Sequence, residues 1–231
     1  MRINPPLLAT GLLLSLTSLT AEATLTPYTS AGQSLVYSSV SNITWTGDAN
    51  LLGTLEASNP NLVSTIISTI GSVTDTPNYY DTPEYSGTHT LNPGDFPYNN
   101  GLVTWFGAQA FVGYLNAINY AGSQQWALPS ASANPQTGYN QTGGHFGQLF
   151  YNELGGTEQP YAYWSGTEYS SNANYVWVFG TSNGFQDYGH KNSYFNVWTV
   201  NPGQVSAVPI PGAAWLFGTG LVGLHRLKRR E

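Results

Sequence analysis

The chain has 231 residues, and its twelve acidic residues outnumber its six basic ones. Five of the basic residues lie near the two ends, so residues 24–207 hold ten acids and one base, Lys191, which gives a net charge of about −9. This charge argues against nucleic acid and sulfated polymers as partners, because Lys and Arg hold phosphate and sulfate groups, and the lack of cysteine excludes disulfides, thiol chemistry and thiolate metal sites.

The N-terminus is organised like a secretory signal peptide. A single positive charge, Arg2, precedes an apolar run over residues 7–19, and Ala21, Glu22 and Ala23 follow as a small-x-small triplet. A run of 13 residues is too short to cross a bilayer, which favours a cleavable signal over an anchor. We expect residues 1–23 to be removed, with Ala21 and Ala23 as the small residues of the cleavage site.

Two strands and a helix are expected first in the mature chain. Residues 35–37 and 43–45 are short β-favouring runs separated by a polar turn. Asn59 and Pro60 then open a helix, since proline is accepted in a first helical turn, and Gly71 ends it. The apolar face of this helix comprises Leu62, Val63, Ile66, Ile67 and Ile70. A strand remains the alternative because the segment is rich in β-branched residues.

A long loop and a second helix come next. Residues 72–101 show no sustained hydrophobic period, which predicts an ordered loop with room for a short hairpin. Thr104 is a suitable N-cap for a helix that ends at Gly122. Its helical spacing is carried by Trp105, Ala108, Phe111, Val112, Leu115 and Ile118. Residues 126–129 are predicted to form a buried apolar corner, and residues 130–142 a second polar loop.

The last part of the domain is expected to combine a short helix with antiparallel strands. Residues 145–154 form the helix, with Phe146, Leu149 and Phe150 inward and two glycines at its end. Residues 175–179 and 194–198 alternate in polarity around a turn at residues 182–184, which predicts antiparallel strands. The fold class is therefore α+β, and the predicted core includes Trp126, Leu128, Trp164 and Trp177.

The C-terminal segment has the features of a membrane span. Val208, Pro209, Ile210 and Pro211 form a stiff extended start, because proline disfavours helix in the residue before it. The 18 residues 207–224 carry no charge, which is just enough to span a bilayer. Four cations follow and would remain cytoplasmic: Arg226, Lys228, Arg229 and Arg230. The alternative, a buried helix with a basic tail, is disfavoured because a globular domain seldom gathers its bases in this way.

This tail resembles the PEP-CTERM sorting signal in its VPxPA-like variant, with Gly212 where alanine is usual. The resemblance implies export through the secretion machinery, a transient stay in the inner membrane of a Gram-negative bacterium, and processing by an exosortase. It further implies release to the cell surface or extracellular matrix. Three parts are thus expected, namely a signal peptide (1–23), one domain (24–207) and a sorting signal (208–231).

The domain resembles the Lcl C-terminal domain family over about residues 34–203. The matching runs are residues 101–105, 126–129, 149–155, 163–169 and 183–186, together with Lys191. The resemblance implies a loop-rich scaffold similar to the C-type lectin-like superfamily. Ala127 and Asn201 stand where the family usually has arginine, and their loss could leave Glu153 or Glu168 without a partner.

No catalytic, metal or cofactor site is expected. His89, His145 and His190 are not at metal-ligand spacing, and Ser165 belongs to a strand pattern rather than to a triad. The sulfatase-activating enzymes of the superfamily need cysteines, so the resemblance does not extend to that activity. Asn183, Asp187 and Asn192 are candidate calcium ligands, but one carboxylate is too few and a turn is favoured.

Tyrosines in polar loops are the strongest functional indication. The candidate ligand surface comprises Tyr79, Tyr80, Tyr85, Tyr139 and Tyr188, with Tyr98 in a similar setting. Aromatic faces beside Asn and Asp suit the apolar face and the hydroxyls of a sugar, whereas the alternative is that these rings pack loops onto the core. The leading hypothesis is an exported, non-enzymatic adhesion or matrix protein that binds extracellular polysaccharide; the second is a structural coat or protein-interaction domain without a small ligand.

Overall fold

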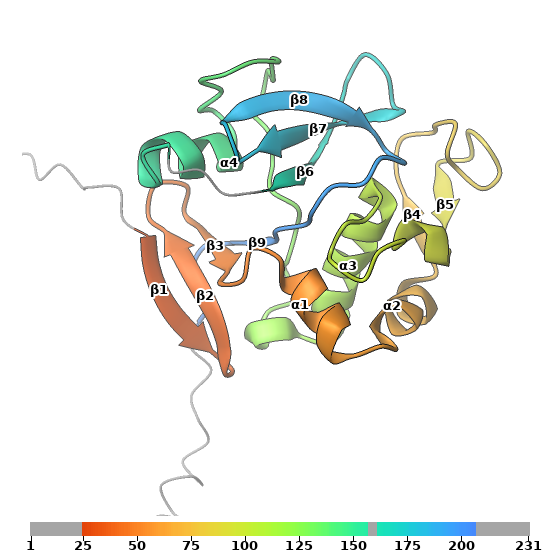
Figure 1. Ribbon diagram of the computed structural model, residues 1–231, viewed down its shortest axis with the longest axis horizontal. Helices are drawn as coiled ribbons and strands as arrows, with labels where there is room; N and C mark the ends of the chain where they lie inside the picture. The colour runs from red at the N-terminus through yellow and green to blue at the C-terminus, as the bar shows by residue number, and fades with distance from the viewer. Residues whose placement is uncertain (1–24, 157–160, 207–231) are drawn as a thin grey trace, which may run out of the picture.

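The computed structural model describes residues 25–156 and 161–206, which form antiparallel sheets and short helices (Figure 1). This mixed architecture confirms the predicted α+β class at that level. The signal peptide with Ala21 and Ala23, the motif at residues 208–211 and the basic cluster at residues 226–230 lie outside the described residues. Within the described ranges, no helix is both long enough and apolar enough to cross a membrane.

Both ends of the domain meet in one four-stranded sheet. Its order is β1-β2-β3-β9, and all of its neighbours are antiparallel. The strands are β1 (Leu25–Ser30), β2 (Gln33–Ser38), β3 (Ile43–Thr46) and β9 (Val200–Pro202). The two predicted strands are confirmed as β2 and β3. The sequence analysis missed β1, which contains Pro27 and pairs with β2 alone, as suits an edge strand.

Three helices lie to one side of this sheet, and the second of them in chain order packs against the other two on the side away from the sheet (Figure 1). They are α1 (Leu51–Ser58), α2 (Leu62–Ile70) and α3 (Trp105–Ala117). The two predicted helices are confirmed as α2 and α3: Gly71 ends α2 with a φ of 73°, and the Thr104 hydroxyl accepts the Gly107 N–H. The predicted end of the second helix at Gly122 was wrong, because α3 ends at Ala117, Ile118 is its exposed C-cap residue, and residues 120–122 form a separate 3-10 helix. Helix α1 was missed because Asp48 looked like a break. Instead, the Asp48 carboxylate accepts the Asn50 N–H and the Thr54 hydroxyl, which fixes the start of α1.

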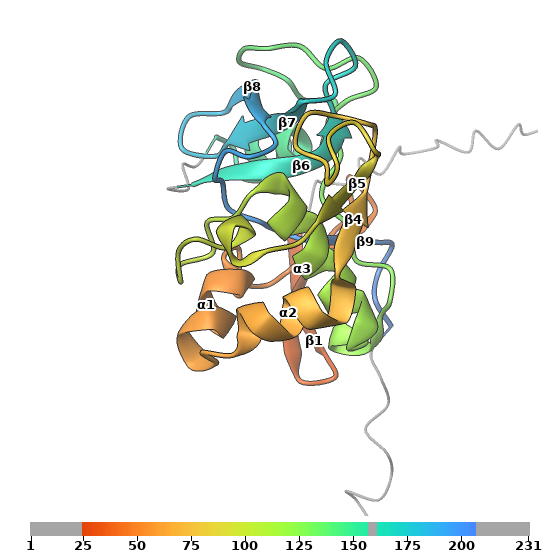
Figure 2. The ribbon, with the colours of Figure 1, turned by 90° about the vertical axis from the view of Figure 1, so that its right-hand side faces the viewer.

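The long segment after α2 folds as a hairpin with an extended tip. Strands β4 (Ser72–Thr74) and β5 (Thr88–Thr90) pair, and a 3-10 helix, η1 (Pro93–Asp95), follows them. This confirms the predicted ordered loop with a short hairpin. The residues between the strands, 75–87, are called the hairpin tip here, and Figure 2 shows the tip beside the second sheet.

The second sheet has the order β6-β7-β8 and is antiparallel. Its strands are β6 (Ala162–Glu168), β7 (Tyr175–Gly180) and β8 (Phe185–His190). The prediction that residues 194–198 form a strand was wrong. Strand β8 follows the turn directly and occupies the remaining edge of β7, so residues 194–198 form only isolated bridges, Phe195 with Val103 and Asn196 with Tyr163.

The core forms two clusters. The larger surrounds α3 and includes Trp126, Leu128 and Trp164; the smaller gathers around Trp45 and Phe146. All four predicted core residues, Trp177 among them, are buried. The predicted helix at residues 145–154 is confirmed as a short α4 (His145–Gly147) that continues as a π-helix, η3 (Gln148–Glu153). Its Phe146, Leu149 and Phe150 point inward.

Candidate ligand-binding surface

A continuous row of ring side chains runs from the second sheet to the hairpin tip. We call it the aromatic ladder; it comprises Tyr79, Tyr80, Tyr169, Tyr175, Trp177, Tyr188 and His190. Tyr169 and Tyr188 stack with their ring centroids 4.3 Å apart, and Tyr175 and His190 lie 4.1 Å apart. Edge-to-face contacts link Tyr188 to Tyr175 at 5.5 Å, and Trp177 packs against both Tyr169 and Tyr188.

Strand register explains why these rings share one face. Successive side chains of a strand point to opposite faces, so Tyr175 and Trp177 project together from β7. Antiparallel pairing sets Tyr175 opposite His190 and Trp177 opposite Tyr188. The intervening Val176 points the other way, into the core around α3. The four ladder residues on β7 and β8 therefore share a face because of the two-residue periodicity of these neighbouring strands.

The hairpin tip extends the ladder beyond the sheet. The Tyr80 hydroxyl lies 2.9 Å from Nδ1 of His190, and the Tyr79 ring packs edge-on against Tyr80 at 5.6 Å. The Tyr79 N–H donates to the side-chain carbonyl of Asn174 at 2.9 Å, which fixes the tip beside the start of β7. Segments about 95 residues apart in sequence, 79 and 174, thus present one surface.

A polar groove of about 470 Å³ adjoins the ladder. One wall is residues 133–137, and the other includes Tyr169, Trp177 and Tyr188. Polar groups at the rim come from Asn134, Gln136, Thr137, Thr167, Ser170 and Ser171. The buried Gln186 holds the loop wall, because its Nε2 donates to the Gln136 carbonyl at 2.9 Å. The groove thus combines aromatic faces with hydroxyl and amide groups.

The only base in residues 24–207 is Lys191, which directly follows His190 of the ladder. The Lys191 side chain is 0% exposed and donates to Asp75 of the hairpin tip at 2.5 Å and to Glu168 of β6 at 2.9 Å. Its Nζ also lies 4.6 Å from the centre of the Trp105 ring. Of the two carboxylates expected to lose a partner, Glu168 is therefore paired, with Lys191.

The structure divides the predicted tyrosines. Tyr79 and Tyr188 are exposed members of the ladder, but Tyr80 is half-buried, packed against the core and therefore not a free ring as predicted. Tyr85, which is 62% exposed, lies apart from the ladder, and Tyr139 packs on Phe185 at the opposite end of β8.

Tyr98 pairs with Tyr194 at a centroid distance of 5.6 Å, away from the ladder. The sequence analysis missed Tyr169, Tyr175 and His190 as surface residues. Correct pairing of residues 175–180 with 185–190 would have placed Tyr175 and His190 beside Tyr188.

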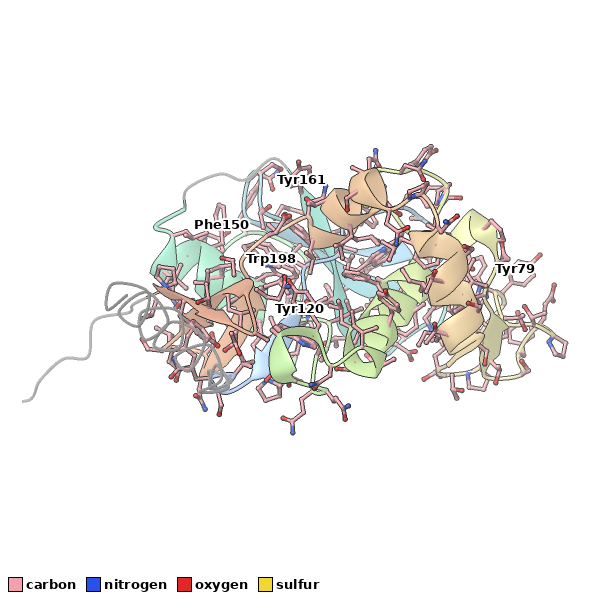
Figure 3. The ribbon with its side chains drawn as sticks, turned by 90° about the horizontal axis from the view of Figure 1, so that it is seen from below. Tyr79, Tyr120, Phe150, Tyr161 and Trp198 are labelled. Carbon is pink, nitrogen blue, oxygen red and sulfur yellow. The ribbon has the colours of Figure 1, made fainter. Side chains whose placement is uncertain are left out.

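A second groove, of about 670 Å³, lies along α1. Its lining includes Asn50, Thr54, Asn100, Tyr161, Phe195 and Asn196. The Asn50 side chain donates to the Asn100 carbonyl and accepts from Asn196 Nδ2 at 3.3 Å, so part of its polar lining is already paired. Figure 3 shows Tyr161 well apart from Tyr79, which separates this groove from the hairpin end of the ladder.

Other predicted polar groups serve turns and strands. The Ser165 hydroxyl is buried and accepts the Thr167 N–H at 3.1 Å. In the turn before β8, Asn183 accepts the Phe185 N–H. Asp187 lies within β8 and accepts the N–H of the next residue, Tyr188. Among the described residues, no three His, Asp or Glu side chains are grouped so as to hold a metal ion.

His89 anchors the base of the hairpin tip in a charged form. Its Nδ1 lies 2.6 Å from the Tyr80 carbonyl and its Nε2 lies 3.1 Å from the Asp95 carboxylate. Both partners accept, so only the doubly protonated ring can donate to both. Burial lowers the pKa of His89, but the bonds to Asp95 and Tyr80 outweigh it, and the net pKa is raised above 6.5.

The stability that His89 contributes is therefore expected to depend on pH. Because its pKa is raised on folding, the contribution is complete below pH 6.5 and is lost as the pH rises through the folded value. His89→Gln should thus lower the free energy of unfolding more at pH 6 than at pH 9. Urea unfolding at both pH values checks this, and an equal loss at the two would show that His89 is neutral in the folded protein.

The two family arginine positions lie side by side. Ala127 forms a bridge with Val200, next to Asn201, whose Nδ2 donates to the Ser123 hydroxyl at 2.7 Å. This supports the expectation that both positions share one environment. Glu153 is half-buried elsewhere, and its carboxylate has no cation beside it in the described residues, as the sequence analysis expected of one of the two glutamates; burial raises the pKa of this carboxyl.

Comparison with known protein families identifies the family of the domain that carries this surface. The model of the Lcl C-terminal domain matches residues 34–201, a stretch that contains α3, the second sheet, the hairpin tip and the complete ladder. No curated protein sequence matches the chain. The family suggests a secreted or surface-associated protein. Since the match covers most of the chain, this protein belongs to the Lcl C-terminal domain family.

Proposed function

We propose that the protein is a non-enzymatic surface or matrix protein that binds polysaccharide along the aromatic ladder. The observation that carries the proposal is the unbroken row of rings from Tyr169 to Tyr79 beside a polar groove. A flat aromatic face matches the apolar face of a sugar ring, and nearby hydroxyl and amide groups match its hydroxyls. An extended row suits a chain of sugars better than a single one.

The charge of the domain narrows the ligand class. Residues 24–207 carry about −9, and Lys191, their one base, is fully buried. The negative charge of the domain would repel an anionic polymer. Proteins bind anionic groups mainly through Lys and Arg, and the described part of the domain exposes neither. Neutral polysaccharides are therefore the expected ligands.

The proposal includes export of the protein from the cytoplasm. The signal peptide and the PEP-CTERM-like tail support secretion, retention in the inner membrane by the basic cluster, and release by an exosortase near Val208 to Pro211. A C-type lectin-like scaffold agrees with a loop-rich ligand surface. We expect intact-mass measurement of surface-located protein, from a host with an active exosortase, to show that residues 212–231 are absent; their retention would indicate a permanently anchored protein instead.

The ladder predicts which variants lose binding. Tyr188→Ala should weaken binding of a neutral polysaccharide about two- to tenfold, because one ring contact is worth on the order of 0.5–1.5 kcal/mol and about 1.4 kcal/mol equals a factor of ten. Tyr169→Ala should act similarly, since Tyr169 stacks on Tyr188. Affinity electrophoresis in gels that contain neutral glucans, mannans or galactans, chosen from a glycan array, measures the effect.

Tyr85→Ala is the matched control. Tyr85 is an exposed tyrosine of the same hairpin tip but lies outside the ladder, so its removal should leave retardation in the gel unchanged. Tyr161→Ala tests the second groove: a loss confined to this variant would move the ligand to α1. Absence of binding to every neutral and acidic polysaccharide would favour a structural coat or protein-interaction domain.

A further inference from the structure

Three charged side chains meet in the core between the second sheet, α3 and the hairpin tip. Nζ of Lys191 lies 2.5 Å from Oδ2 of Asp75 and 2.9 Å from Oε1 of Glu168. The Lys191 side chain is 0% exposed, the Asp75 side chain 1% and the Glu168 side chain 24%. The rings of Trp105 and Phe106, 4.6 and 6.0 Å from Nζ, complete the enclosure.

This setting favours neutral over charged groups. Burying an ammonium and a carboxylate is costly, and close approach repays the cost only in part. Burial raises the pKa of Asp75 even though Lys191 lowers it. The second oxygen of Asp75, Oδ1, is buried without a hydrogen-bond partner, so the carboxylate is not fully satisfied as an ion. Proton transfer from Nζ to Asp75 would leave an uncharged amine against an uncharged acid.

We propose that Lys191 and Asp75 condense spontaneously into an intramolecular amide, with Glu168 as the catalytic residue that transfers the protons. The amide joins Nζ of Lys191 to Cγ of Asp75 and links two segments 116 residues apart. This covalent modification goes beyond the polysaccharide-binding function and does not depend on it.

The step balances without any other reactant. Nζ, once neutral, donates its lone pair to Cγ of the protonated Asp75, and the C=O electrons move to oxygen. Glu168 accepts a proton from the positively charged nitrogen of the new N–C bond and donates it to the hydroxyl of Asp75, which becomes water. The C–O bond then breaks, the carbonyl re-forms, and one water leaves; the ammonium and the carboxylate become one amide and one water.

The residues around Lys191, Asp75 and Glu168 favour amide formation. Asn78 Nδ2 donates to Oδ2 of Asp75 at 2.9 Å, which holds the carboxyl group of Asp75 in place beside Nζ. The Thr76 N–H donates to Oε1 of Glu168 at 3.3 Å and helps to hold the carboxylate against Nζ. Glu168 also lines the polar groove beside the ladder, so the water has a route to solvent.

The amide would give the domain a covalent cross-link, which its cysteine-free sequence cannot provide as a disulfide. The chain has no cysteine, so no disulfide can brace it after export. A cross-link between distant residues restricts the unfolded chain, and it does so more strongly the longer the loop it closes. This link would pin the hairpin tip, which carries Tyr79 and Tyr80, to the end of β8, which carries His190.

Peptide mass mapping of the denatured full chain tests the proposal. Chymotrypsin suits the digestion because the chain is rich in aromatic residues and has one base between its ends. A peptide containing residue 75 should appear joined to one containing residue 191, with the summed mass less one water. Asp75→Asn should give the same joined peptide, because its amide forms by loss of ammonia. Lys191→Arg and Glu168→Gln should give separate peptides.

Glu56→Gln is the matched control, since Glu56 is a buried carboxylate with a raised pKa and no lysine beside it; its digest should still contain the joined peptide. If the digest of the unaltered chain contains the two peptides only as separate species, the proposal is overturned. A fragmentation spectrum that places the bond on Glu168 would overturn the assignment of Asp75 as acceptor. Joining that persists undiminished in Glu168→Gln would overturn the role of Glu168.

Discussion

Trp164→Ala is expected to lower the free energy of unfolding by about 3–5 kcal/mol, the cost typical of truncating a large buried aromatic side chain. The Trp164 side chain is 0% exposed and lies in the centre of β6, where its ring packs edge-on against Phe195 at 4.8 Å. Its indole N–H donates to the Val103 carbonyl at 2.9 Å, which would lose its donor. Urea unfolding followed by fluorescence or circular dichroism measures the loss.

The control for this substitution is a large ring at the surface. Tyr194 is 41% exposed and adjoins Phe195 in sequence, so Tyr194→Ala removes a similar side chain from solvent rather than from the core. Its effect should stay within about 0.5–1 kcal/mol, as for most surface positions. Equal losses in the two variants would contradict the position of Trp164 in the core.

Lys191→Met is expected to cost about 3–5 kcal/mol at neutral pH, because removing one partner leaves buried carboxylates uncompensated. Asp75 and Glu168 would then face each other without a cation. The pKa of Asp75 is already raised by burial, and loss of Lys191 removes its main opposing influence. Loss of the proposed amide would add to the cost.

The effect of Lys191→Met should also depend on pH. A carboxyl with a raised folded pKa destabilises the protein at high pH, where it must ionise, and ceases to do so as the pH falls towards its ordinary value of 3.8. The variant should therefore recover stability, relative to the unaltered chain, between pH 7 and pH 4. Adding Asp75→Asn and Glu168→Gln to Lys191→Met should restore part of the stability at pH 7. A cost that is independent of pH and of the added substitutions would show that the lost contribution is packing.

The sequence by itself determined the elements whose hydrophobic period is strong. Residue spacing alone predicted the apolar face of α2, the Thr104 cap of α3 and the tryptophans of the core. Apolar residues that share one buried face recur at the period of the helix or strand, and this period is visible in the local sequence. Family membership was also predicted from the sequence, since the short motifs around Trp126 and Trp164 occur in the same order as in the family. Short elements were less visible: β1 contains a proline, and α1 follows Asp48, which resembled a break.

Only the tertiary structure decided the candidate site. Which strand pairs with β7 depends on which edge remains free, so the sequence placed the partner at residues 194–198 when β8 occupies that edge. That register sets Tyr188 beside Trp177 and His190 beside Tyr175, and thereby creates the ladder. The meeting of Asp75, Glu168 and Lys191 is likewise a product of packing between distant segments, since charge and spacing in a sequence do not show which lone cation becomes buried.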